Sequence, residues 1–365
     1  MSDAGQPAPE PDRVEGAPHP RATSVLYGQE AAEAAFLAAS RAGRLHHAWL
    51  LSGPRGVGKA TLAWRIARHL IAAEGAGTLD MDPAHPVFRR CLSLGEARLF
   101  LLRRGWDERG ERLRTVIDVE ETRKLRSFLQ LSAMDAGWRA IIIDAADEMN
   151  PSAANALLKL LEEPPRRVAF LLVSHQAARL LPTIRSRCRE LRCTPLAAPD
   201  LARALAAAGI EGASSALAEL SGGSVGEAVR LAAEGGPAIY GEIAGLLASL
   251  PRLDRPALVA LAESVAGRGA AGRYDLALRL VPLALARLAR AGASGLLPPE
   301  AAPGEAATLA RLAPGTPAAR AWAETAQRLT ARVTHARGVN LDPAQVMLDT
   351  FFEIETTAQR LLAAA

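Results

Sequence analysis

Short apolar runs alternate with helical patterns over the first half of the chain. Three runs, at 48–52, 139–144 and 168–173, are almost uninterrupted and predict strands that are buried on both faces. A fourth strand is predicted at 115–119, whereas 74–113 is too polar and irregular to predict an element. Apolar positions at helical spacing predict helices over 29–42, 59–73, 120–130 and 151–161. This order predicts an α/β module, a parallel sheet flanked by helices.

The pattern changes after residue 195. Strand-like runs end, and Ala/Leu-rich helical segments continue to the last residue, with breaks near 222–223, 235–236 and 297–317. The first residues are rich in Pro, Ala, Gly and acidic residues, which is typical of disorder. We therefore expect four parts: a disordered tail at 1–23, the α/β module at 24–195, a small helical domain at 196–243 and a helical bundle at 244–365.

Composition narrows the class of protein. A hydrophobic content of 49% in 365 residues excludes global disorder, and 4% aromatic residues argue against a β-sandwich or barrel. Three cysteines disfavour a disulfide framework and favour a reducing compartment. The chain has neither a signal-peptide pattern nor an uncharged apolar run of membrane-spanning length, so we expect a cytoplasmic protein without a membrane partner. A net charge of +4 permits contact with nucleic acid without demonstrating it.

A glycine-rich turn joins the first predicted strand to the next helix. Its spacing is that of a phosphate-binding loop, in which backbone N–H groups and a lysine hold phosphate oxygens. The candidate nucleotide-binding residues are Gly53, Gly56, Gly58, Lys59, Ala60 and Thr61. Ala60 occupies the place of the hydroxyl that binds magnesium, and Thr61 lies about 100° further round the helix. We expect weak binding of ATP or ADP with a poorly held metal; the alternative is a strand-to-helix turn without a ligand.

A second motif ends the strand at 139–144. Asp144 has the position of the acidic residue that holds magnesium in P-loop proteins, although a simple strand-end cap is an alternative. Hydrolysing members place a glutamate next, but here the next residue is Ala145. Glu148 follows three residues later and is expected on a different turn. Because a lost general base commonly costs about 10²–10⁴-fold in rate, we expect no intrinsic ATPase activity.

Two longer motifs support a resemblance. The run Asn-Ala-Leu-Leu-Lys-Leu-Leu-Glu-Glu-Pro-Pro at 155–165 is followed by Leu-Pro-Thr-Ile-Arg-Ser-Arg-Cys at 181–188, and Leu-His-His-Ala-Trp at 45–49 precedes the phosphate loop. In this order the motifs resemble the clamp-loader branch of the AAA+ ATPases, over roughly 25–195. The resemblance implies a AAA+ P-loop domain at 24–195, a helical lid at 196–243 and a collar for oligomerisation at 244–365.

The resemblance also implies roles for three residues. Arg187 matches the arginine finger that reaches a neighbouring subunit's nucleotide, unless it forms only a surface salt bridge. Ser174 matches the first sensor, unless it only satisfies local backbone groups. Gly226 occupies the place of a second-sensor arginine, which is a third loss from the site.

These roles imply a non-hydrolysing subunit of the bacterial DNA polymerase III clamp loader, and so of a nucleotidyltransferase complex. Its expected partners are the delta and gamma/tau subunits in a hetero-pentamer, the sliding clamp and primed DNA. No zinc or other metal is expected, because the region that carries four cysteines in many relatives offers only Cys91 and His85. Two alternatives stay open: an ATP-hydrolysing gamma/tau-type subunit, and a DNA-binding adaptor that keeps the fold as a scaffold.

Overall fold

The computed structural model describes residues 10–72, 77–107, 110, 112–130, 137–210, 214–267, 269–338 and 341–363. Contacts divide the chain into two compact units. The first comprises 1–211 and 223–229, and the second comprises 212–222 and 230–365. The expected division into lid and collar at residue 243 stays a prediction.

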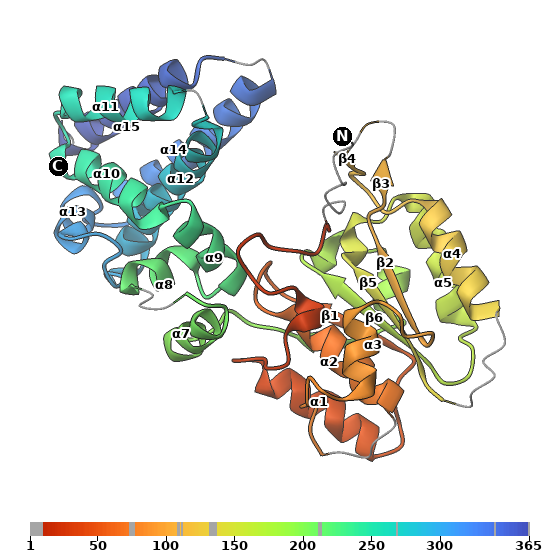
Figure 1. Cartoon of the computed structure of the whole chain (residues 1–365). Coiled ribbons are helices and arrows are strands. Elements are labelled where there is room, and N and C mark those ends of the chain that lie inside the picture. The colour runs from red at the N-terminus through yellow and green to blue at the C-terminus, as the bar shows by residue number, and fades with distance from the viewer. Residues whose placement is uncertain are drawn as a thin grey trace, which may run out of the picture. The chain divides into compact units, whose positions relative to one another are not determined.

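The first unit is a parallel α/β layer structure (Figure 1). Its main sheet has the strand order β2-β5-β6-β1-β7, and β3 and β4 form a separate antiparallel pair. In chain order the elements are η1 (Pro20–Ala22), α1 (Glu30–Arg41), β1 (Ala48–Ser52), α2 (Lys59–Ala72), α3 (Pro86–Leu92), β2 (Leu99–Arg103), β3 (Trp106–Asp107), β4 (Arg112–Leu113), α4 (Val119–Gln130), β5 (Arg139–Asp144), η2 (Ala146–Glu148), α5 (Pro151–Glu162), β6 (Val168–Ser174), η3 (Ala177–Arg179), α6 (Pro182–Arg185), β7 (Arg189–Arg192) and α7 (Ala198–Ala207). Helix α9 (Val225–Ala233) begins in this unit and ends in the second.

Helices cover both faces of the sheet. One face of β5 and β6 packs against α4 and α5 through side chains such as Ile141, Phe170 and Leu157. Helix α2 lies on the other face, against β1, β5 and β6, and almost all of its residues are buried. Strands β5 and β6 are therefore buried from both sides, which explains their continuous apolar sequences.

The second unit is helical. Its elements are α8 (Ser215–Ser221), α10 (Gly236–Ser249), α11 (Arg255–Ala266), α12 (Ala271–Ser294), α13 (Glu305–Leu312), α14 (Thr316–Gly338) and α15 (Pro343–Ala363). Helix α12 packs along α14, and α15 packs against α11 and α14. No helix in the described parts of the chain is both long and apolar enough to cross a bilayer. The predicted class, an α/β module followed by helices, is confirmed.

Several local predictions are wrong. The segment at 115–119 is not a strand: Ile117 makes one isolated bridge to Met149, and α4 begins at Val119. The region at 74–113 contains α3 and three strands, and the break at 297–317 contains α13. Strand β7 was not predicted at all. Residues 10–23 were expected to be disordered, but they contain η1 and ion pairs, while 1–9 lie outside the described residues.

Candidate functional site

The predicted phosphate loop joins β1 to α2 and depends on its glycines. Gly53 has a φ of 141°, and a Cβ at this position would lie 2.1 Å from the carbonyl oxygen of Cys193. At Gly56 φ is 79°, and a Cβ would lie 2.3 Å from the Oγ of Ser224. Only glycine fits either position without a shift of the neighbouring atoms. The loop therefore keeps the backbone shape of a phosphate cradle, with Gly58 also at positive φ.

Lys59 lies at the start of α2 and is only 3% exposed. Its Nζ donates to the carbonyl oxygen of Gly53 at 2.8 Å and also to that of Pro54. Burial lowers the pKa of Lys59 to about 8, although the carboxylates of Asp144 and Asp147 oppose this change. The amine that would hold phosphate is thus bonded to carbonyls of its own loop.

The next two positions of α2 lack a well-placed metal ligand. Ala60 has only a methyl group, and Thr61 is buried one residue further along the helix. Within the described residues, no three His, Cys, Asp or Glu side chains are grouped to hold a metal ion. The residues present at this loop do not fit a bound magnesium ion. The expected absence of zinc stays a prediction.

Asp144 ends β5 and is buried. Burial raises the pKa of Asp144 to about 7, and the nearby carboxylate of Asp12 adds to the increase. Ala145 follows it, and Glu148 forms an ion pair with the Nε of Arg104 at 2.8 Å. The carboxylate of Glu148 is therefore already paired within the chain.

Two polar side chains lie at the end of β6 and directly after it. The Oγ of Ser174 and the Nδ1 of His175 are both buried without a hydrogen-bond partner among the described residues. The backbone N–H of His175 donates to Asp147 Oδ1 at 2.9 Å. Burial lowers the pKa of His175 to about 4, and the positive charge of Lys59 contributes, so the ring is neutral at pH 7. Sequence reasoning predicted Ser174 but missed His175, whose only signal was its position directly after that strand.

The N-terminal segment lies at the same edge of the sheet. Arg103 ends β2 beside Asp144 in the strand register, and it pairs with Glu10 and with the buried carboxylate of Asp12. Glu10 and Asp12 also approach His19, at 3.4 Å each. The ordered segment therefore brings an acidic side chain close to Asp144, which the sequence did not indicate.

The second-sensor segment contacts the phosphate loop directly. Ser224 Oγ donates to the carbonyl oxygen of Arg55 at 2.9 Å, and the N–H of Gly226 donates to that of Gly56 at 3.1 Å. A Cβ on Gly226 would lie 3.1 Å from the Cα of Gly56. There is little room at this position for a second-sensor arginine.

Arg187 lies between α6 and β7, and 35% of its side chain is exposed. Its Nη1 donates to the carbonyl oxygen of Thr183 at 3.0 Å, and its Nη2 donates to Glu162 Oε1 at 2.9 Å. The surface salt bridge considered as the alternative is therefore present. The ion pair leaves other N–H groups of the guanidinium unused.

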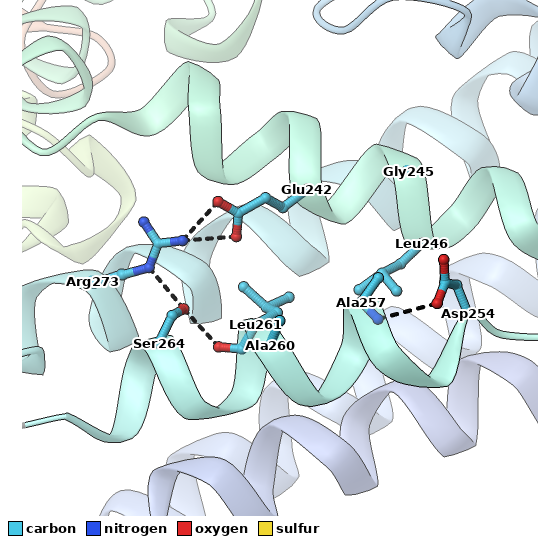
Figure 2. A pocket seen from close by; sticks show the side chains of 9 residues that line it. All are labelled: Glu242, Gly245, Leu246, Asp254, Ala257, Ala260, Leu261, Ser264 and Arg273. Atoms are coloured by element: carbon cyan, nitrogen blue, oxygen red, sulfur yellow. Dashed lines mark hydrogen bonds and ion pairs between the residues drawn. The ribbon is translucent and has the colours of Figure 1, made fainter.

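A pocket in the second unit is a separate candidate. It has a volume of about 460 Å³ between α10, α11 and the start of α12 (Figure 2). Arg273 donates to both carboxylate oxygens of Glu242 and to Ser264, and Asp254 caps α11. Each of these polar groups has a hydrogen-bond partner within the chain, so the pocket gives no sign of a particular ligand.

Comparisons with known proteins find relatives for most of the first unit. The family model described as DNA polymerase III, delta subunit, matches residues 28–197. The DNA polymerase III subunit delta' of Pseudomonas aeruginosa is 39% identical over 196 residues, which cover 52% of this chain and 56% of that protein. Residues 28–197 are therefore similar to the delta-prime clamp-loader family. The chain matches only about half the length of this relative.

Other similarities extend beyond delta-prime. The gamma/tau subunit of Mycobacterium tuberculosis is 34% identical over 173 residues, 46% of this chain and 28% of that protein. A solved gamma subunit-related protein of Thermotoga maritima covers 86% of this chain and 95% of its own, with 15% identity and a TM-score of 0.37. The clamp-loader match contains the phosphate loop, Asp144, Ser174 and Arg187. Gly226 and the second unit lie outside it.

Proposed function

We propose that this chain is a non-hydrolysing, delta-prime-type subunit of a cytoplasmic DNA polymerase III clamp loader. One observation carries the proposal: the loop keeps the shape of a phosphate cradle, while Ala60, Ala145 and Gly226 replace the groups that chemistry requires. ATP or ADP would bind weakly, through Lys59 and the N–H groups of the loop, and would not be hydrolysed.

In this proposal the chain acts on a neighbour's nucleotide. The first unit docks beside an ATP-binding gamma/tau subunit and presents Arg187, whose guanidinium stabilises the charge that develops on the transferred phosphoryl group. The helical second unit joins the chain to the delta and gamma/tau subunits in a hetero-pentamer. The assembly then loads a sliding clamp onto primed DNA.

The first test is ATP turnover by the isolated chain. We expect turnover no higher than that of the Lys59→Ala variant, which sets the background. The gamma/tau-type alternative, supported by the similarity to that subunit over 173 residues, requires robust magnesium-dependent hydrolysis. Hydrolysis above the Lys59→Ala background would refute the proposal in favour of that alternative.

The second test is made in the reconstituted loader. Arg187→Ala should leave the assembly intact and reduce DNA-stimulated ATP turnover by about tenfold or more, because arginine fingers contribute about 10³–10⁵ to kcat in other P-loop enzymes. Arg185→Ala removes an equally charged, exposed side chain two residues away and serves as the control. Equal turnover by the two variants would remove the proposed role. Clamp-independent binding of primed DNA by the chain alone would instead favour the adaptor alternative.

A further inference from the structure

The contacts of Arg187 point to a residue that orients it. Glu162 is the last residue of α5, and its Oε1 accepts a hydrogen bond from Arg187 Nη2 at 2.9 Å. The carbonyl oxygen of Thr183 accepts from Nη1 at 3.0 Å. We infer that Glu162 is a positioning residue for Arg187: with Thr183, it fixes the plane in which the guanidinium meets the neighbouring subunit's phosphates. This inference rests on the proposed function.

Both residues that accept hydrogen bonds from Arg187 are next to buried residues in the sequence. Leu161, directly before Glu162, is 1% exposed, and its carbonyl oxygen lies 3.1 Å from the ring Nε2 of His47. Ile184, directly after Thr183, is fully buried. The arginine side chain itself is long and has many rotamers, so it needs such fixed points to hold one orientation.

The two hydrogen bonds leave part of the Arg187 guanidinium available to a phosphate. A guanidinium has five N–H groups, and these contacts use one on each terminal nitrogen, which leaves three for a phosphate. Contact at two nitrogens restricts rotation about the last side-chain bond. A guanidinium that is already oriented before the reaction lowers the barrier to phosphoryl transfer, because this step depends on where the positive charge lies.

Because this ion pair is exposed, its loss can change the orientation of Arg187 without lowering the stability of the fold. The Arg187 and Glu162 side chains are 35% and 49% exposed, and pairs of this kind contribute little to folding. Loss of Glu162 should therefore leave the fold and the assembly unchanged while the finger becomes less ordered.

The experiment is a double-mutant cycle in the reconstituted loader, read out as kcat and KM for ATP. Glu162→Ala should lower kcat about threefold, since small misplacements of catalytic groups are costly, with KM unchanged. Glu162→Gln retains an oxygen acceptor of the same reach and should restore most of kcat. Glu163→Ala removes the exposed carboxylate next to it and should have no effect. In the Arg187→Ala background, Glu162→Ala should change nothing further.

Each outcome decides a different point. If Arg187→Ala does not slow turnover, both the proposed function and this inference are overturned. If Arg187→Ala slows turnover but Glu162→Ala matches Glu163→Ala, the inference alone is overturned. An equal loss from Glu162→Ala with and without Arg187 would also overturn it, because the effect would not act through the finger.

Discussion

The buried carboxylate of Asp144 should make the stability of the first unit depend on pH. Its pKa is raised from 3.8 to about 7 by burial and by Asp12, whereas the unfolded chain has the ordinary value. Between these values the folded chain keeps the proton that the unfolded chain has released, so the free energy of unfolding falls as pH rises. Each pH unit costs about 1.4 kcal/mol, so the complete loss is about 4 kcal/mol and is reached above pH 7.

Asp144→Asn tests this argument because the amide has nearly the same volume and does not titrate. Relative to wild type, the variant should gain about 4 kcal/mol between pH 4 and pH 8. The assay is urea unfolding in EDTA without nucleotide, followed by tryptophan fluorescence. Four of the five tryptophans lie in the first unit, so a Trp322→Phe background in both proteins restricts the signal to that unit.

Two further variants make the test specific. Glu163→Gln makes the same kind of carboxyl-to-amide change at an exposed position of the same unit and serves as the comparison. Asp12→Asn removes the neighbouring charge, so the pH-dependent loss should end at a lower pH. A difference between Asp144→Asn and wild type that stays constant from pH 4 to pH 8 would refute the reasoning.

Two other predictions concern Gly53, which lies against a backbone carbonyl, and Glu305, which pairs with a buried arginine. Gly53→Ala should destabilise the first unit by about 3 kcal/mol or more in urea unfolding, because its Cβ would meet a backbone carbonyl at 2.1 Å. The control is Gly43→Ala, which has a φ of 63° and open space around it and should cost about 1 kcal/mol. Equal costs would contradict the steric argument. Glu305→Gln should destabilise the second unit by about 3 kcal/mol, because Arg287, 3% exposed and bonded to Glu305 at 2.8 Å, would keep a buried charge with only the more distant carboxylate of Glu219, at 3.5 Å. Glu242→Gln, in an exposed pair, should cost under about 1 kcal/mol, and thermal unfolding of both variants compares the two.

The sequence predicted those elements whose own residues determine their burial. The strands at 48–52 and 139–144 have the predicted bounds, because an uninterrupted apolar run fits a strand covered on both faces. Helix α5 begins at its predicted residue, where Asn150 accepts a hydrogen bond from the N–H of Ala153. These signals are local and need no knowledge of the rest of the chain.

The missed elements depend on distant partners. Strand β7 buries only Leu191, and it exists because it pairs with β1 along the edge of the sheet. The segment at 115–119 has the composition of a strand, but Asp118 accepts hydrogen bonds from the N–H groups of Glu120 and Glu121 and so starts α4. A local pattern cannot decide between these outcomes, because the pairing that settles them comes from elsewhere in the fold.

The candidate site shows the same limit. The sequence shows Ala60 and Ala145 at the two positions, but it could not show that Lys59 is bonded to its own loop or that Asp12 lies near Asp144. The first depends on loop geometry. The second joins residues more than a hundred positions apart, through a segment whose composition indicated disorder.

The geometry also explains why a loop without its chemistry would keep its glycines. Gly53 lies against the backbone that follows β7, and Gly56 lies against the segment that opens α9, with a hydrogen bond from Gly226. These contacts join the edge of the sheet, the loop and the start of α9 through protein atoms alone. Packing alone therefore accounts for these glycines, whereas Ala60 and Ala145 are small apolar residues. In this chain the glycine pattern by itself is thus weak support for ATP hydrolysis, which the ATP-turnover assay tests directly.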